Sequence, residues 1–247
     1  MNVRITRLYQ PNALQCGETI QLNHDASNHL IRVLRTKTGS AVTLFNGDGF
    51  DYFCTTLDNN TKKTTLSINS KSATNKESNL NITLIQGLSR NERMENCIQK
   101  SVELGVNKII PVICQRSNIK LSKEKLTKKR THWQKIIIGA CEQSGRCCIP
   151  VITEVISVND LDTILHSDAI KLTLNPTART SLKNINADIL NKNIELFIGP
   201  EGGLNEEELL YLKDKQFKEI GFGPRVLRTE TAGPAVISAI QMLWGDF

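Results

Sequence analysis

From residue 80 onward, this chain alternates short apolar runs with stretches of helical periodicity. Parallel strands need a helical crossover between them, so this alternation predicts a mainly parallel sheet with helices on both faces. The expected fold class is α/β, and ligands of such sheets bind at the carboxyl ends of the strands. The runs of strand length occupy residues 82–86, 109–113, 150–156, 170–174, 194–198 and 218–222.

Two helices are expected, one between the first and second of these strands and one between the second and third. Asn91 is expected to cap a helix with an apolar stripe, which Gly105 ends. A long helix is expected over residues 123–143.

A loop rich in glycine and proline occupies residues 198–203, with the sequence IGPEGG. Beyond it, Asn205 and Glu208 have the spacing of a capping box, which predicts the start of a helix. The glutamates at 206–208 would fill the favourable field at that helix start, so a phosphate would be repelled. The loop therefore predicts a pocket for a neutral or cationic ligand held by backbone groups. The alternative is a tight turn before a well-capped helix.

A second loop of small residues, 221–232, contains Arg225, Arg228 and Glu230. Pro234 suits the first turn of the helix that follows. That helix is apolar nearly all round, which predicts burial against the sheet or against another subunit.

Residues 1–72 differ from the rest, because short strand patterns at 41–45, 51–57 and 63–69 alternate with turns. This pattern predicts a small β-rich module of barrel type, with a short helix at 27–34. Arg32 and Arg35 on that helix are expected either to contact phosphates or to form a solvated basic edge. Residues 70–79 have the composition of a linker, so the expected domains are 1–72 and 76–247.

Charge and composition exclude several classes of protein. The chain has 31 basic and 25 acidic residues, and this mildly basic balance permits a nucleic-acid partner. It has no long apolar run and no signal-peptide core, so no membrane partner is expected. Its seven cysteines form no CxxC pair and are expected to be reduced cytosolic thiols. Its four histidines lack metal-ligand spacing, so no metal is expected.

A dense basic run lies at the start of the expected long helix. Its members are expected either to follow an RNA backbone or to be a solvated helix face. They are Lys120, Lys123, Lys125, Lys128, Lys129 and Arg130.

Taken together, several segments resemble one known family. They are RNERME at 90–95, QRS at 115–117, EQSGR at 142–146, IGPEGG at 198–203, LRTETA at 227–232 and WGD at 244–246. The chain resembles the SPOUT superfamily of methyltransferases and, within it, the RsmE family of 16S rRNA uridine N3-methyltransferases. The resemblance implies a C-terminal sheet with a deep trefoil knot and an N-terminal PUA-like β-barrel. It also implies a cytoplasmic homodimer that acts on 16S rRNA, with the assembled small ribosomal subunit as the expected substrate.

The resemblance assigns roles to individual residues. S-adenosylmethionine, the implied cofactor, would be held by Leu174, Asn175, Ile198, Gly199, Glu201, Gly202, Phe222, Gly223, Leu227, Thr231 and Ala232. Arg228 and Arg225 would face the uracil oxygens, and Glu230 would orient an arginine or accept the proton. The RNA contacts would come from Arg4, Arg7, Arg32, Arg35, Arg90, Arg93, Arg116 and Arg146. For Arg116 and Arg146, support of the site is the alternative, and for Arg228 it is a salt bridge that props the loop.

Three other functions are weighed against this one. A SPOUT enzyme could act on tRNA or on another rRNA site, and a non-catalytic adaptor would bind RNA without the cofactor. A nicotinamide-dependent dehydrogenase would need a phosphate loop, but no GxGxxG motif follows an early strand.

Overall fold

The computed structural model describes residues 6–74, 76–117, 121–185 and 193–247. These residues pack as two compact units, which we describe separately. Unit 1 contains residues up to 77 together with 141–149, and unit 2 contains 78–140 and 150–247. The segment 141–149 lies outside the 1–72 range expected for the N-terminal domain.

Unit 1 is built on a five-stranded sheet in the order β1-β3-β4-β5-β2, in which only β1 and β3 pair in parallel. Alternating apolar residues, among them Leu44, Cys54 and Leu66, point inward and form its core. The elements are β1 (Thr6–Tyr9), β2 (Thr19–Gln21), α1 (His24–Asn28), η1 (His29–Val33), β3 (Ala41–Phe45), β4 (Phe50–Thr56) and β5 (Thr65–Ala73).

Two expectations for unit 1 are wrong in detail. The helix begins at His24 rather than Ser27, because the side chain of Asn23 accepts a hydrogen bond from the Ala26 N–H and caps it. The expected linker at 70–79 is a strand as far as Ala73, since β5 pairs with β4 along its length. Ladder hydrogen bonds thus order a stretch that has no large apolar residue.

Unit 2 is an α/β fold around a seven-stranded sheet in the order β12-β10-β11-β6-β7-β8, with β9 also pairing to β7. All of these pairings are parallel, as the alternation predicted. The strands are β6 (Asn81–Gly87), β7 (Lys108–Ile113), β8 (Val151–Ile152), β9 (Ile156–Ser157), β10 (Ile170–Leu174), β11 (Asn193–Ile198) and β12 (Lys218–Ile220). The predicted strand at 150–156 is therefore two short strands, and the one at 218–222 ends early. Strand order does not test for a knot, which stays a prediction.

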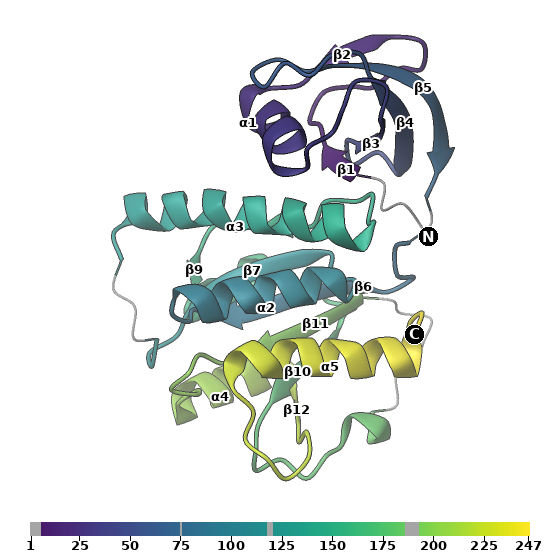
Figure 1. Ribbon diagram of the computed structural model, residues 1–247. Helices are drawn as coiled ribbons and strands as arrows, with labels where there is room; N and C mark the ends of the chain where they lie inside the picture. Colours follow the sequence, from purple (N-terminus) through teal and green to yellow (C-terminus); the bar gives the residue numbers. More distant parts are fainter. Residues whose placement is uncertain (1–5, 75, 118–120, 186–192) are drawn as a thin grey trace. The chain divides into compact units, whose positions relative to one another are not determined.

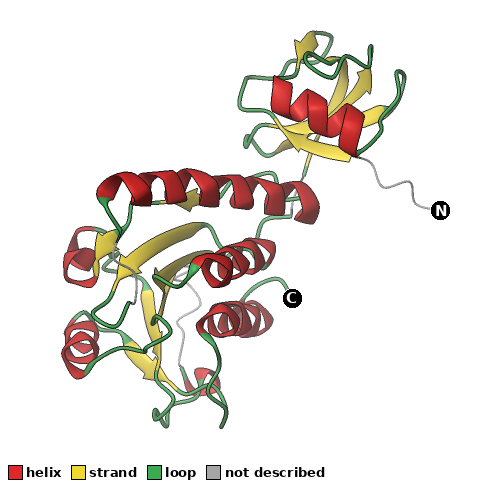
Figure 2. Ribbon diagram, turned by 60° about the vertical axis from the view of Figure 1, so that its left-hand side comes forward, coloured by secondary structure: helices red, strands yellow, loops and turns green. Residues whose placement is uncertain are grey.

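Helices cover both faces of this sheet (Figures 1 and 2). On one face lie α2 (Asn91–Glu103) and α5 (Thr229–Trp244), where Gly233 of α5 approaches Cys97 of α2 and Leu84 of β6. On the other face, η2 (Val158–Thr163) and α4 (Glu206–Asp214) contribute to a core that includes Phe197 and Phe217. The remaining elements are α3 (Lys123–Ser144) and η3 (Leu182–Asn184).

Two helix starts differ from the sequence prediction. Arg90, not Asn91, is the N-cap of α2, and the Asn91 side chain instead accepts a hydrogen bond from Lys129 Nζ at 2.6 Å. Helix α5 begins at Thr229, so Pro234 lies inside the helix rather than in its first turn. Proline there cannot donate to the carbonyl of Glu230, but packing of α5 on α2 holds the helix together. Glu230 therefore belongs to the helix and not to the loop.

Among the described residues, no helix is both long and apolar enough to cross a membrane. The described part of the chain also contains no group of three or more potential metal ligands.

Candidate active site

A pocket of about 410 Å³ lies at the carboxyl ends of β10, β11 and β12 in unit 2. Three loops, which follow these strands, form most of its wall, and residues of α2, α4 and α5 complete it. The lining residues are Arg93, Leu174, Asn175, Pro176, Ile198, Gly199, Pro200, Glu201, Gly203, Leu204, Leu209, Phe222, Gly223, Arg225, Val226, Leu227, Arg228, Thr229 and Ala232. The pocket occupies the position that the strand order predicts for a ligand.

Strand pairing brings the loops together. β10 pairs with both β11 and β12, so the ends of all three strands meet at one edge. The N–H of Asn175 donates to the carbonyl of Ile220, and its side-chain amide donates to Glu219 Oε2 at 2.5 Å. These bonds tie the loop after β10 to the strand that leads into the loop after β12.

Close backbone contacts require glycine at two positions near the pocket. A Cβ on Gly87 would lie 2.5 Å from the nitrogen of Pro200, so the end of β6 can touch the 198–203 loop only without a side chain. A Cβ on Gly202 would lie 2.9 Å from the Cβ of Arg116. The loop therefore lies directly against two other segments.

A buried hydrogen-bond relay fixes the start of α5 against the same loop. Gln86 Nε2 donates to Thr229 Oγ1 at 2.9 Å, and this hydroxyl donates to the carbonyl of Gly199 at 2.9 Å. Gln86 Oε1 accepts from the Cys97 thiol, which keeps its proton because burial raises its pKa to about 12. The relay thus pairs hydrogen-bonding groups from β6, α2, α5 and the loop after β11.

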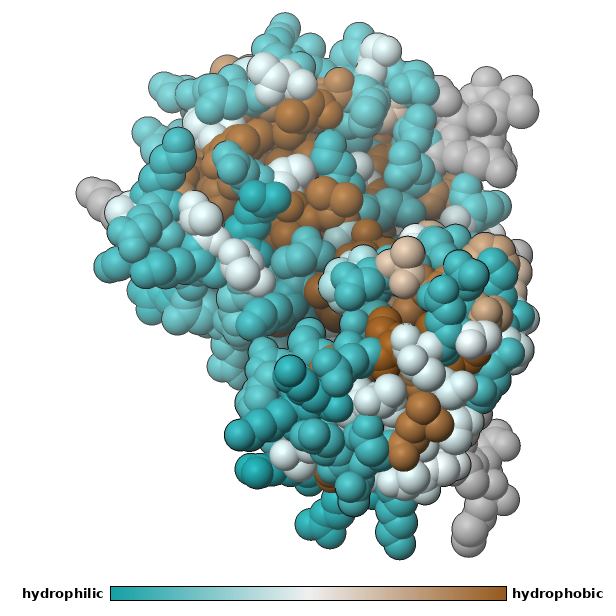
Figure 3. Space-filling model, turned by 90° about the horizontal axis from the view of Figure 1, so that it is seen from above, coloured by the Kyte–Doolittle hydropathy of each residue, from teal (hydrophilic) through white to brown (hydrophobic). Residues whose placement is uncertain are grey.

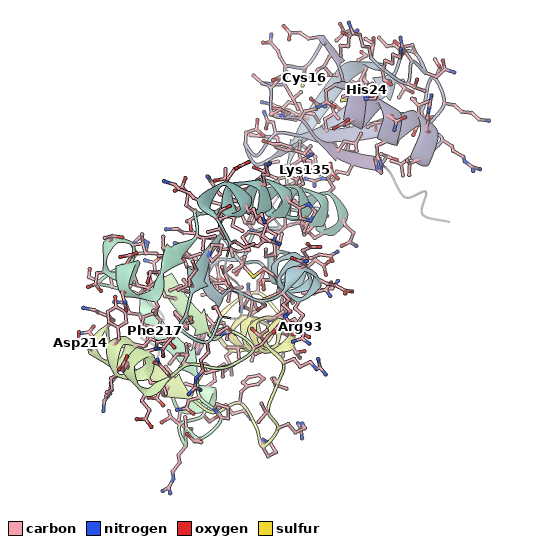
Figure 4. The ribbon with its side chains drawn as sticks, turned by 90° about the vertical axis from the view of Figure 1, so that its left-hand side faces the viewer. Cys16, His24, Arg93, Lys135, Asp214 and Phe217 are labelled. Carbon is pink, nitrogen blue, oxygen red and sulfur yellow. The ribbon has the colours of Figure 1, made fainter. Side chains whose placement is uncertain are left out.

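The charged residues at the pocket include three arginines and one glutamate in the wall. Arg93 of α2 pairs with Glu201 at 2.9 Å, and its Nε lies 3.8 Å from Glu230 Oε1. The position of Arg93 in unit 2 is labelled in Figure 4. Arg225 and Arg228 are exposed on the second loop. Among the described residues, Arg228 makes no ion pair that would prop this loop.

The capping box predicted at α4 is confirmed, but the glutamates of that helix start are not part of the pocket wall. Asn205 and Glu208 cap each other's backbone, and Glu208 Oε1 also accepts from the N–H of Gln115 at 2.7 Å. Glu207 and Glu208 line a separate hollow of about 290 Å³ and not the main pocket. The charged residues of the pocket wall itself are therefore three arginines and Glu201.

Most residues predicted to hold a cofactor line the pocket. Gly202 and Thr231 do not, while Arg225 and Arg228 from the predicted catalytic set do. Glu230 lies just behind the wall, and its Oε2 is buried without a hydrogen-bond partner among the described residues.

Sequence reasoning missed the pocket roles of Gln86, Arg93 and Thr229. Gln86 had one available signal, since it is the polar residue that ends an otherwise apolar strand pattern.

The predicted RNA contacts divide into four groups, one of which is Arg93 in the pocket wall. Arg32, Arg35, Arg90 and Arg116 are exposed, whereas Arg4 lies outside the described residues. Hydrophilic side chains cover most of the face in Figure 3, so exposure alone does not single out an RNA surface.

Arg7 and Arg146 are committed to contacts inside unit 1. Arg7 pairs with Asp51 at 2.9 Å, and the side chain of Arg146, only 4% exposed, pairs with Glu77 at 2.6 Å. Both guanidinium groups are thus occupied by partners inside unit 1, which argues against the predicted RNA contacts of these two residues.

Some residues of the basic run at the start of α3 also make contacts within the protein. Lys128 pairs with Glu124, and Arg130 donates to the carbonyl of Ile152. Lys123 and Lys125 are exposed, and Lys120 lies outside the described residues.

Comparisons with known proteins agree with this architecture. Residues 76–241 match the model of an RNA methyltransferase domain, and residues 22–65 match that of an RNA methyltransferase PUA domain. The chain is 35% identical to the ribosomal RNA small subunit methyltransferase E of Buchnera aphidicola, over all of this chain and 99% of the relative. This chain belongs to the RsmE family of RNA methyltransferases.

Two solved structures resemble this RsmE-family chain over nearly its full length. The ribosomal RNA small subunit methyltransferase E of Neisseria gonorrhoeae, bound to S-adenosylmethionine, is 36% identical with a TM-score of 0.92, and the match covers 99% of this chain and 100% of that one. The methyltransferase Lpg2936 of Legionella pneumophila, in complex with the same cofactor, is 38% identical with a TM-score of 0.94, at the same coverage. The expected α/β fold with a parallel sheet and a PUA-like first region is thereby confirmed.

Proposed function

We propose that this chain transfers the methyl group of S-adenosylmethionine to N3 of a uridine in 16S rRNA of the small ribosomal subunit. The observation that carries the proposal is the pocket at the ends of β10, β11 and β12, where a glycine-rich loop and two exposed arginines meet. Membership of the RsmE family supports the reaction class and the RNA substrate.

The pocket fits S-adenosylmethionine in size and chemistry. Its volume of about 410 Å³ is in the range of small-molecule sites. Leu174, Ile198, Phe222 and Leu227 offer an apolar slot for an adenine ring, and the arginines and Glu201 offer partners for the charged amino-acid end. The cofactor supplies an electrophilic methyl group when bound.

The residues around the pocket would act on the uridine by charge and position. N3 must lose its proton before it can attack a methyl group, and negative charge then develops on the uracil oxygens. Arg228 and Arg225, which are exposed at the pocket wall, would donate hydrogen bonds to those oxygens. Glu230 or Glu201 would accept the proton or orient an arginine. Fixed loops would add to the rate by holding the base in line.

We also propose that the chain acts as a homodimer. α5 buries one face against α2 and the sheet, yet Met242 and Leu243 near its end are exposed, as is Phe247. An apolar face of this kind is suited to a second copy of the chain. The assembled small subunit would supply the RNA shape that exposes the target uridine.

One experiment tests the reaction. Purified protein is incubated with radiolabelled S-adenosylmethionine and either undermethylated small subunits, free 16S rRNA or tRNA, and the products are digested for nucleoside mass spectrometry. N3-methyluridine from 16S rRNA is expected, with small subunits as the better substrate. Labelling of tRNA, or a 2′-O-methyl or N1-methylguanosine product, would contradict the proposal. Absence of cofactor binding by calorimetry would indicate an RNA-binding adaptor instead.

A further inference from the structure

Arg93 connects two walls of the pocket that come from distant parts of the chain. Its Nη1 lies 2.9 Å from Glu201 Oε1 in the loop after β11, and its Nε lies 3.8 Å from Glu230 Oε1 in the first turn of α5. The arginine itself projects from the first turn of α2. One guanidinium thus lies within ion-pair distance of two carboxylates and lines the pocket as well.

The surroundings of the two carboxylates explain why a cation is needed there. The side chains of Glu201 and Glu230 are each 20% exposed, so solvent screens them only in part. Glu230 Oε2 is buried and lacks a hydrogen-bond partner among the described residues. Without Arg93, two partly buried negative charges would remain at the pocket wall, and their repulsion would push the loop and the helix start apart.

We propose that Arg93 is a positioning residue that holds the 198–203 loop and the start of α5 in their active arrangement, rather than a contact for the RNA backbone. This inference rests on the proposed function. Arginine is suited to the task, because its planar fork can donate to two carboxylates at once, whereas a lysine ammonium is a single point charge. The Gly199 to Thr229 hydrogen bond joins the same two segments, so the ion pairs of Arg93 form a second link between them.

The test compares Arg93→Gln and Arg93→Lys with a matched control, Lys100→Gln. Lys100 lies on the same helix and loses the same charge, but it pairs with Glu103 and does not line the pocket. For each variant we would measure cofactor affinity by calorimetry, kcat and KM with small subunits, the salt dependence of RNA binding, and Tm.

If Arg93 positions the pocket, Arg93→Gln lowers kcat about 30- to 100-fold and weakens cofactor affinity about fivefold. KM for the small subunit and the salt slope of RNA binding stay near wild type, and Tm falls by less than about 3 °C. Arg93→Lys recovers only part of the loss. Lys100→Gln behaves as wild type.

A phosphate contact would give a different pattern and overturn the inference. In that case Arg93→Gln raises KM and lowers the salt slope by about one, while cofactor affinity and kcat are unchanged. Wild-type kcat in Arg93→Gln would also overturn it, as would a fall in Tm large enough to account for the lost activity. If wild-type protein binds no cofactor, the proposed function itself fails, so the two failures are distinguishable.

A second arm tests the ion pairs directly. Glu201→Gln is made alone and in the Arg93→Gln background, and cofactor affinity is measured in all four proteins. Coupling of about threefold or more is expected if the two side chains act together. Additive effects would show that the 2.9 Å pair has no part in shaping the pocket.

Discussion

The hydroxyl of Thr229 donates a hydrogen bond to the carbonyl oxygen of Gly199 at 2.9 Å, which joins the first residue of α5 to the loop after β11. Because Gln86 donates to the same hydroxyl, its proton is directed toward Gly199. These hydrogen bonds link the start of α5, strand β6 and the loop after β11 beside the pocket.

We expect Thr229→Val to remove the hydrogen bonds of this hydroxyl. The change keeps the side-chain shape but leaves the Gly199 carbonyl and one Gln86 N–H unpaired, at a cost of about 1–3 kcal/mol in the free energy of unfolding. Cofactor affinity should fall in parallel, measured by calorimetry beside chemical unfolding. Thr229→Ser, which keeps the hydroxyl, is the control and should retain most of the affinity. Equal behaviour of the two variants would mean that the bond has no role.

Gly87→Ala, at the end of β6, should distort the pocket by displacing the 198–203 loop. The new Cβ would lie 2.5 Å from the backbone nitrogen of Pro200 and 2.8 Å from the carbonyl carbon of Gly199, so the loop must move. We expect a loss of about 1–3 kcal/mol in stability together with weaker cofactor binding. Gly139→Ala in α3 is the control, because its added Cβ would have no described neighbour within 4 Å beyond the local backbone of its own helix, and it should stabilise by about 0.5–1 kcal/mol.

Replacing Glu195 in β11 by glutamine should stabilise the protein in a pH-dependent way. Burial raises the pKa of this carboxyl, although the His166 N–H and nearby cations oppose the rise. A raised folded pKa means that the ionised form destabilises the fold at neutral pH, and that this penalty is lost as pH falls through the folded pKa. Glu195→Gln removes the charge at every pH.

We therefore expect Glu195→Gln to raise Tm by about 2 °C near pH 7.5, with the gain disappearing near pH 4. Thermal unfolding across this range, monitored by circular dichroism, measures it. Glu154→Gln, at a side chain that is 78% exposed, should show little change at either pH. A gain from Glu195→Gln that is independent of pH would argue against a buried charge.

Arg228→Ala should separate turnover from cofactor binding. Its side chain is exposed at the N-cap of α5 and makes no capping hydrogen bond, so its removal should leave the loop in place. We expect kcat to fall by about 100-fold or more, with cofactor affinity within about threefold of wild type. Single-turnover kinetics and calorimetry measure the two quantities. Equal losses in both would indicate that Arg228 supports the loop.

The proposed dimer makes a prediction for the exposed end of α5. Met242 is 66% exposed, and Met242→Glu places a charge in the expected interface, which should shift the protein to monomer in light scattering. Leu210→Glu is a matched control, because Leu210 is also 66% exposed but lies on α4. It should leave the mass unchanged. A wild-type protein that is monomeric at micromolar concentration would contradict the dimer.

The sequence by itself determined the main strands and helices and their order, although not all of their ends. Strands such as 82–86 and 109–113, the helix at 123–143 and the capping box at Asn205 depend on nearby residues, because apolar periodicity, chain reversal and helix capping are local properties. The same local signals indicated which strand ends carry the pocket, since glycine-rich loops follow β11 and β12.

Only the tertiary structure decided which charges meet. Arg93, Glu201 and Glu230 are brought together by the crossovers of the parallel sheet, and no spacing in the sequence encodes that contact. Likewise, folding buries the Arg146 side chain and places Glu207 and Glu208 of α4 in the wall of a different hollow. Charge and loop type can be read along a chain, but burial and partner choice arise from packing between segments that are distant in sequence.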